Sequence, residues 1–211
     1  MTGTVAFLFA GFRNTLLLVV IAFGSSLVVG TFVAVCRVAP VPILPRVARA
    51  EVELFRNTPL LIQMFFLRLA LPSAGIHMSA FAAAALALCL YTAAYVTEVV
   101  RSGISSVGKG QMEASRSLGL GFVKSMRLVA LPQAFRTVVP PLGNLMIAMV
   151  KNSAIAAAIG FPELVYQAEV LNGRTARTFE LFTLVALGFW TITLPLSFGV
   201  SRIERRMRIL R

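Results

Sequence analysis

A long uncharged apolar run, from Asn14 to Cys36, constrains this sequence more than any other feature. Arg13 and Arg37 bracket the run, and a helix needs about 20 largely apolar residues to cross a bilayer. Of the 211 residues, 58% are hydrophobic and 13% are charged, whereas soluble domains are usually about a quarter charged. So few charges cannot cover the apolar surface in water. We therefore expect an all-α integral membrane protein, with residues 1–211 forming a single transmembrane domain.

Further apolar runs predict about five membrane-spanning helices. They are expected at about residues 12–37, 57–72, 78–100, 134–158 and 181–202. The first should end before Pro40, because proline has no backbone N–H to donate. The second is short and contains Arg68, and the fourth should be kinked at Pro140 and Pro141. The third has an Ala-rich first half, which suits close packing against another helix.

The positive charges are distributed unevenly between the connecting segments. A net charge of +12 invites a nucleic-acid function, but such a function needs a basic face on a soluble fold. Most of the 20 Lys and Arg residues fall on one side if the N-terminus lies outside. Cytoplasmic loops carry such an excess of Lys and Arg. We therefore predict an outside N-terminus, a cytoplasmic C-terminus and no nucleic-acid partner.

Residues that could support catalysis or metal binding are sparse. The sequence has no Asp, one histidine (His77) and two cysteines (Cys36 and Cys89) inside apolar runs, so neither a catalytic group nor a metal site is predicted. It also lacks a G-x-x-x-x-G-K-[ST] loop, which cradles nucleotide phosphates in many ATPases. We expect no cofactor on this chain and no ATP hydrolysis by it.

The inner segment 109–132 carries the strongest functional signal. Glu113–Leu118 can form a short helix, which Gly119 and Gly121 would break. Ser125–Leu131 can form a second helix that stops at Pro132. The expected result is a compact knob whose apolar residues need a partner surface: Leu118, Leu120 and Phe122. On composition alone, the same segment also fits an ordinary basic loop.

The spacing within this segment resembles the EAA motif of ABC importer permeases. The matching positions are Glu113, Ala114, Ser115, Gly119, Val129, Leu131 and Pro132. Ser115 stands where that family usually has a second alanine, and Val129 where it usually has isoleucine. The resemblance implies that these residues dock into a cytoplasmic ATPase and couple its cycle to transport.

Other segments resemble the polar amino acid permeases within that family. Residues 56–63 (RNTPLLIQ) are similar to its RGTPLLVQ box, with Arg56, Thr58, Pro59 and Gln63 in place and Asn57 substituting for glycine. Residues 94–104 resemble its AYxxExxRxGI pattern, 109–114 its KGQxEA and 151–155 its K-N-T-S-L segment. The resemblance extends over roughly residues 12–205. It implies the five-helix core of a type I ABC importer permease.

The resemblance also implies a function and a set of partners. We expect the permease subunit of an ATP-driven amino-acid importer that works by alternating access in the bacterial cytoplasmic (inner) membrane. ATP and Mg would bind to separate cytoplasmic ABC ATPase subunits. A second permease copy or paralogue and an extracytoplasmic substrate-binding protein would complete the complex. The alternatives are an ABC permease for another small solute, and a channel or secondary carrier without an ATPase.

Ionisable residues at membrane depth are costly and often mark a transport pathway. Lys151 is expected in the outer half of the fourth helix, where it either meets a substrate carboxylate or extends to the interface. Arg68 is interpreted as an interfacial arginine or a pathway residue. Glu98 is interpreted as an ion-pair partner of Arg101 or as a pathway residue. Asn152 completes the candidate set for the substrate pathway.

Overall fold

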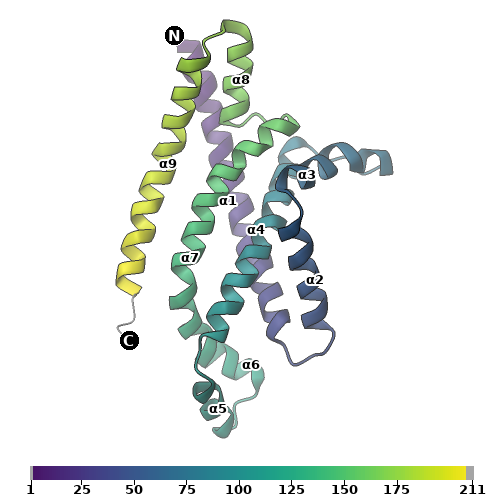
Figure 1. The fold of residues 1–211 in the computed structure, drawn as a ribbon, viewed down its shortest axis with the longest axis vertical. Helices are drawn as coiled ribbons and strands as arrows, with labels where there is room; N and C mark the ends of the chain where they lie inside the picture. The colour runs from purple at the N-terminus through teal and green to yellow at the C-terminus, as the bar shows by residue number, and fades with distance from the viewer. Residues whose placement is uncertain (1, 208–211) are drawn as a thin grey trace.

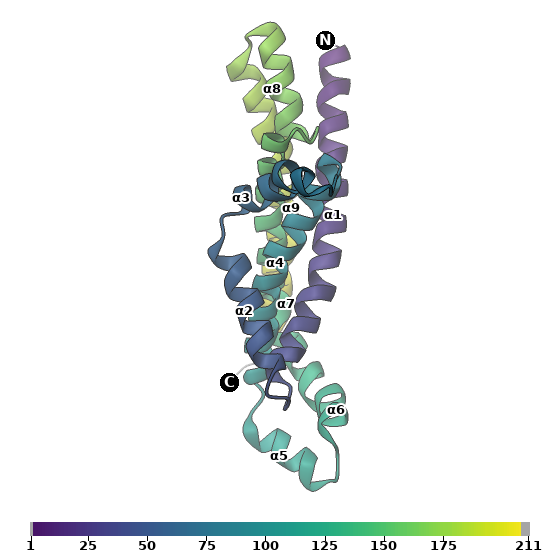
Figure 2. The ribbon, with the colours of Figure 1, turned by 90° about the vertical axis from the view of Figure 1, so that its right-hand side faces the viewer.

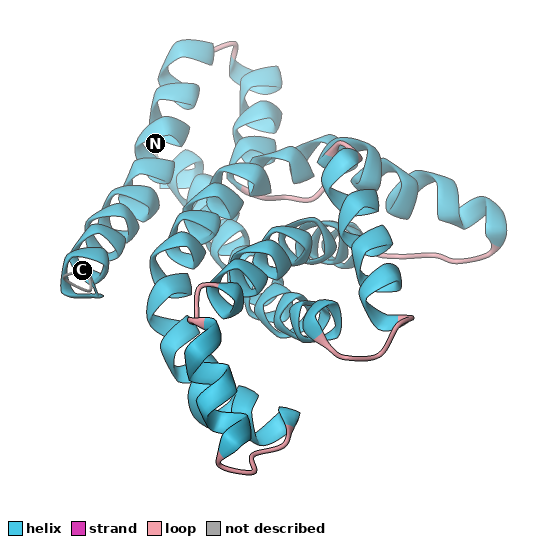
Figure 3. Cartoon of the chain, turned by 60° about the horizontal axis from the view of Figure 1, so that its bottom comes forward, coloured by secondary structure: helices cyan, strands magenta, loops and turns pink. Residues whose placement is uncertain are grey.

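The computed structural model describes residues 2–207 and contains helices joined by short loops over that range (Figure 3). The elements in chain order are α1 (Thr2–Val38), α2 (Leu44–Asn57), α3 (Leu60–Phe65), η1 (Phe66–Ala70), η2 (Leu71–Ala74), α4 (Ala80–Ser105), α5 (Lys109–Ser117), α6 (Phe122–Ser125), η3 (Met126–Ala130), α7 (Leu131–Asn152), η4 (Ser153–Ile159), α8 (Leu164–Thr175) and α9 (Thr178–Met207). The all-α prediction is confirmed.

Within the described range, four helices are long and apolar enough to cross a membrane: those at Thr4–Val38, Ala80–Ser105, Phe122–Ile159 and Thr178–Met207. They run together along the long axis of the molecule (Figure 1). The first begins earlier than the predicted residue 12, because apolar residues continue toward the N-terminus and Leu8 packs against Leu164 and Leu181. It ends at Val38, before Pro40.

The central packing contact joins α1 to α4 through small residues. A Cβ added to Gly30 would lie 2.6 Å from the Ala93 carbonyl oxygen, so only glycine lets the two backbones approach this closely. The Thr97 hydroxyl donates a 3.1 Å hydrogen bond to the Gly30 carbonyl across the same contact. The Ala-rich half of α4, predicted to suit close packing, includes the fully buried Ala83 and Ala87.

The predicted second span differs most from its expected form. Residues 60–74 form the short helices α3, η1 and η2, which run across the long axis instead of along it (Figure 1). Pro59 marks the N-terminal boundary of α3, and Gly75 ends η2 with a left-handed φ of 81°. The helices α2 and α8 were not predicted from the sequence, because charged residues interrupt their apolar patterns. The structure places α2 against α1 and α4, and α8 against α1 and α9.

Two short π-helical turns share a local sequence pattern. Both η1 and η3 end in alanine and are followed by Leu-Pro, at Leu71-Pro72 and Leu131-Pro132. A proline inside an α-helix lacks the N–H that would reach the carbonyl four residues earlier, and its ring clashes with that carbonyl. The wider turn accommodates this defect. The helix therefore continues through Pro132 into α7, so the predicted stop at this residue was wrong.

Candidate functional site

The segment predicted to couple to an ATPase forms a helical hairpin at the end of the molecule opposite the N-terminus (Figure 2). Helix α5 ends at Ser117, and Gly119 lies two residues later with a left-handed φ of 77°, which suits glycine. The Gly119 N–H donates to the Arg116 carbonyl (2.9 Å) and the Leu120 N–H to the Ser115 carbonyl (3.1 Å). Gly121 then precedes α6. The two glycines thus separate the two helices, as the sequence predicted, but the second helix begins at Phe122 instead of the predicted Ser125.

Apolar side chains lie exposed on this hairpin and its continuation. The exposed fractions are 81% for Leu118, 74% for Val123 and 62% for Leu128. Leu120 and Phe122, which the sequence analysis also expected on the surface, are half-buried. Exposed apolar side chains at three positions of one short segment are suited to contact with another protein. We call Leu118, Val123 and Leu128 the hairpin apolar face.

The EAA-like residues separate into exposed and buried groups. Glu113 and Ala114 are exposed on α5, and Gly119 and Pro132 are also exposed. Ser115 is buried, and its hydroxyl donates to the Ser125 hydroxyl over 2.8 Å. The remaining two motif residues, on η3 and at the start of α7, are half-buried: Val129 and Leu131. The exposed group is available to a partner, while the buried group holds the hairpin together.

Glu98 lies at the inner end of α4 among three arginines from three helices. Its carboxylate forms an ion pair with Arg37 of α1, accepts from Arg101 of α4 at 2.9 Å and lies 3.9 Å from Arg56 of α2. Arg56 also stacks over the Tyr95 ring, 5.2 Å from its centroid. The expected Glu98–Arg101 pair is therefore present within a larger network. This network joins the RNTPLLIQ box to the AYxxExxR pattern.

The remaining residues of the RNTPLLIQ box shape the corner between α2 and α3. The Thr58 hydroxyl donates to the Leu54 carbonyl at 2.7 Å, which closes the last turn of α2. Pro59 immediately precedes α3. The Gln63 amide then donates to the Phe55 and Thr58 carbonyls, each at 2.9 Å. These contacts give the box a structural role as a helix corner.

The other candidate pathway residues lie toward the opposite end from Glu98. Lys151 is exposed near the end of α7, roughly 22 Å beyond Arg136 at 1.5 Å per residue, and the half-buried Asn152 follows it. Within residues 2–207, Lys151 forms no hydrogen bond or ion pair. Arg68 donates to the Met78 carbonyl at 2.7 Å and thereby ties η1 to the approach of α4. The structure therefore separates Glu98 from Lys151 along the long axis.

A buried polar cluster that the sequence did not predict lies between α1 and α8. Glu163 is fully buried, and its carboxylate accepts from the Tyr166 N–H at 2.8 Å as the N-cap of α8. Burial raises the pKa of Glu163 to about 7. Its second oxygen has no partner within the described chain. From α1, Asn14 donates to the Pro162 carbonyl and Thr15 accepts from the Leu164 N–H. The signal in the sequence was a glutamate directly before an apolar run.

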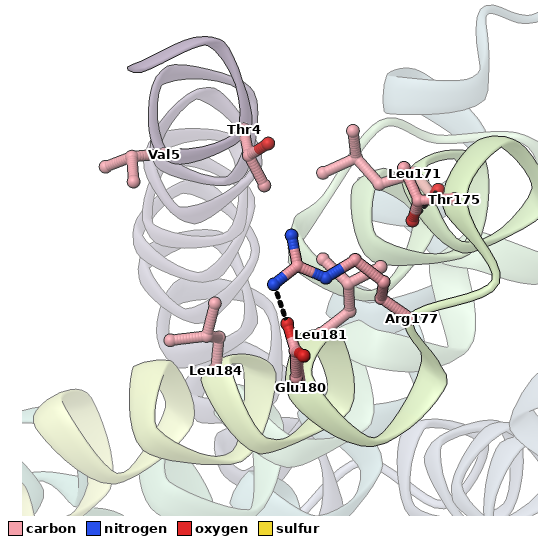
Figure 4. A pocket seen from close by; sticks show the side chains of 8 residues that line it. All are labelled: Thr4, Val5, Leu171, Thr175, Arg177, Glu180, Leu181 and Leu184. Atoms are coloured by element: carbon pink, nitrogen blue, oxygen red, sulfur yellow. Dashed lines mark hydrogen bonds and ion pairs between the residues drawn. The ribbon is translucent and has the colours of Figure 1, made fainter. Parts of the chain in front are cut away.

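A cavity of about 260 Å³ lies at the N-terminal end, between α1, α8 and α9. Thr4 and Val5 line one side, and Leu184 approaches from α9 (Figure 4). Arg177 and Glu180 lie in this cavity and pair with each other. None of the site residues predicted from the sequence lines it.

The family described as "Binding-protein-dependent transport system inner membrane component" matches residues 26–209. The chain belongs to this family. It is a membrane-embedded permease, a transport component and not an enzyme, and the ATPase of such systems is a separate subunit.

Curated relatives of this permease cover nearly its whole length. It is 43% identical over 197 residues to the "Probable glutamine ABC transporter permease protein GlnM" of Bacillus subtilis (strain 168), covering 93% of this chain and 91% of the relative. It is 37% identical over 215 residues to the "Glutamate transport system permease protein GluC" of Corynebacterium efficiens, covering 96% and 94%. It is 35% identical over 205 residues to the "Glutamine transport system permease protein GlnP" of Escherichia coli (strain K12), also covering 96% and 94%.

Solved structures share the fold of the permease. A chain from the "Crystal structure of an amino acid ABC transporter with histidines" matches with a TM-score of 0.90 at 36% identity, covering 98% of this chain and 96% of that one. A chain of the MetNI methionine ABC transporter matches with a TM-score of 0.82 at 22% identity, which supports the fold alone. The relatives and the structure at 36% identity confirm the resemblance to ABC permeases of the polar amino acid type.

Proposed function

We propose that this permease carries polar amino acids of the glutamine and glutamate kind into a bacterial cell, across its cytoplasmic membrane. The names of the relatives support this substrate class. An extracytoplasmic binding protein delivers the amino acid, and the permease alternates between outward-open and inward-open states. The alternative of an ABC permease for another small solute differs only in the cargo.

The observation that carries the ATP-driven part of the proposal is the hairpin apolar face. Leu118 is 81% exposed although it lies outside the membrane spans, where water would surround it. Covering such a surface with another protein is favourable by about 25 cal/mol for each Å² of apolar area removed from water. We infer that the cytoplasmic ABC ATPase covers it. ATP and Mg bind to that partner, and its movement reaches the permease through the hairpin.

The exposed position of Lys151 supports pairing of two permeases. A lysine that faced acyl chains in the outer half of α7 would cost about 3 kcal/mol or more. A second permease copy or paralogue across from α7 would provide a polar space between the two chains. In that space Lys151 meets the carboxylate of the substrate and Asn152 meets its ammonium group.

The test is reconstitution of the permease with its ATPase and binding protein in proteoliposomes. ATP-dependent uptake of radiolabelled glutamine is expected, and the ATPase should co-purify with the permease. Leu118→Glu places a charge in the hairpin apolar face and should abolish both ATPase co-purification and uptake. Leu44→Glu, at an exposed leucine of α2, is the matched control and should retain the ATPase.

Two results would overturn parts of this proposal. Uptake without any ATPase would favour the alternative of a channel or secondary carrier. ATP hydrolysis that is stimulated by a binding protein loaded with another solute, but not by glutamine or glutamate, would replace the substrate class while leaving the ATP-driven mechanism in place.

A further inference from the structure

Two serines connect the helices of the inner hairpin. Ser115 on α5 is 3% exposed and Ser125 at the end of α6 is 0% exposed. The Ser115 hydroxyl donates to the Ser125 hydroxyl at 2.8 Å, and the Ser125 hydroxyl donates to the Leu120 carbonyl at 3.3 Å. One chain of hydrogen bonds therefore joins both helices and the glycine turn between them.

The hydroxyl groups add a connection and are not needed to fill space. Alanine, the usual residue at the position of Ser115 in EAA motifs, has nearly the same volume as serine. Neither serine depends on the other for a partner, because Ser115 also reaches the Met112 carbonyl at 2.8 Å and Ser125 reaches Leu120. Removing the Ser115 hydroxyl would thus leave the Ser125 hydroxyl with its hydrogen bond to the Leu120 carbonyl. The specific consequence of the pair is that α5 is held against α6.

A weaker point in the helix follows directly after the hairpin. In η3 the Leu131 N–H donates to the Met126 carbonyl, five residues earlier, and Pro132 has no N–H to offer the Leu128 carbonyl. Such π-turns are rare inside helices and occur frequently at functional sites. The joint between hairpin and α7 therefore has fewer regular hydrogen bonds than either part that it connects.

We propose that Ser115 and Ser125 are positioning residues that keep the angle between α5 and α6 constant throughout the transport cycle. The hairpin then moves as one rigid lever, and the bending that accompanies ATP binding falls on η3. This inference rests on the proposed function in one respect, namely that an ATPase docks on the hairpin. It goes further by assigning rigidity and bending to particular residues.

The experiment introduces a disulfide in place of the hydrogen bond. The double variant Ser115→Cys and Ser125→Cys is made in a background of Cys36→Ala and Cys89→Ala, which removes both native thiols. Since the two hydroxyl oxygens are 2.8 Å apart, the sulfurs lie near the bonding distance of about 2.05 Å. Titration of the free thiols measures what fraction of the protein has formed the disulfide. Glutamine uptake and ATP hydrolysis are then measured in proteoliposomes with the ATPase and binding protein.

The oxidised and reduced forms should give the same uptake per ATP, within about twofold, because the bond restrains an angle that does not change. A loss of roughly tenfold on oxidation that dithiothreitol reverses would show that α5 opens from α6, and would overturn the inference. Failure of the disulfide to form would also overturn it, because the contact itself would then be absent. The Cys36→Ala, Cys89→Ala parent, treated with the same oxidant, is the matched control.

A second variant tests the bending point. Pro132→Ala restores an N–H opposite the Leu128 carbonyl and favours a regular α-helix through η3. We expect uptake per ATP to fall by roughly fivefold, the factor that corresponds to one net hydrogen bond of about 1 kcal/mol. Unchanged uptake per ATP would remove η3 as the bending point. If the parent protein itself showed no ATP-dependent uptake, the proposed function would fail instead, so the two failures are distinguishable.

Discussion

At the scale of single residues, Glu98 holds together the inner ends of three helices. Its carboxylate contacts Arg37, Arg56 and Arg101, which come from α1, α2 and α4. All three arginines lie close to the C-terminal ends of their helices, where positive charge is favourable. One carboxylate between three guanidinium groups leaves excess positive charge, which suits the cytoplasmic side of a membrane protein.

Glu98→Gln should destabilise the permease by about 1–3 kcal/mol, because an amide oxygen replaces a charged acceptor of two arginines. The midpoint of thermal unfolding in detergent is the measurement. Glu180→Gln is the matched control, since the Arg177–Glu180 pair is more than half exposed and such pairs contribute little. Equal midpoints for the two variants would contradict the central role of Glu98.

Glu163, which lies between the spanning helices α7 and α9, should make stability depend on pH. The folded-state pKa of about 7 exceeds the ordinary value of 4.5, so the unfolded chain ionises first as pH rises. The free energy of unfolding should therefore fall between about pH 4.5 and 7, by up to about 3 kcal/mol, and level off above that range.

Thermal unfolding across this pH range checks the prediction. Glu163→Gln removes the titrating group and should flatten the slope, while its amide oxygen can still accept from the Tyr166 N–H. Glu169→Gln, an exposed site on the same helix, should keep most of the slope. The same slope in Glu163→Gln and in the wild type would assign the pH dependence to another group.

At the scale of elements, the inner hairpin depends on backbone conformation more than on side-chain volume. A Cβ added at Gly119 would meet nothing within 4 Å, yet its φ of 77° is unfavourable for other residues. A Cβ added at Gly110, which lies in α5, would also meet nothing within 4 Å. The φ of Gly110, however, is not left-handed. These two glycines therefore separate the effect of conformation from the effect of crowding.

Gly119→Ala should destabilise the hairpin by about 1–2 kcal/mol, because alanine is strained in the left-handed region. Gly110→Ala should stabilise α5 by about 0.5–1 kcal/mol, since alanine favours helices. The rate of hydrogen exchange at the amides of α5 reports both changes. ATP-coupled glutamine uptake should fall in the first variant and persist in the second, and a fall in both would point to crowding by the ATPase.

At the scale of the whole molecule, four long helices stand side by side with the hairpin at one end and the N-terminus at the other (Figure 1). A single chain leaves Lys151 exposed in the outer half of α7. Much of α9 is also exposed, including Trp190, but its large exposed residues are apolar and suit contact with lipid. On the proposed pairing, the side of Lys151 would face the second permease.

Lys151→Ala should lower glutamine uptake by roughly 10- to 100-fold, the effect of losing one charge-assisted hydrogen bond of about 1.5–3 kcal/mol. Assembly with the ATPase should remain, since Lys151 lies far from the hairpin. Arg13→Ala, at another exposed cation toward the N-terminal end, should transport normally. Wild-type uptake by Lys151→Ala would exclude this residue from the pathway.

Local signals in the sequence suffice for the class of the fold and the location of the inner hairpin. Uncharged apolar runs specify membrane helices because the bilayer excludes charge over about 20 residues. Gly119 and Gly121 specify a break because their backbone preferences act locally. Both signals depend on neighbouring residues, so they can be interpreted without knowing the tertiary fold.

Only the tertiary structure decided how distant residues meet. It turned the predicted second span into a corner across the bundle, brought Arg56 to Glu98 and buried Glu163 against α1. It also paired Ser115 with Ser125, although the motif alone suggested only a substitution for alanine. These contacts depend on which helix faces pack together, and no local pattern encodes the partner of a side chain.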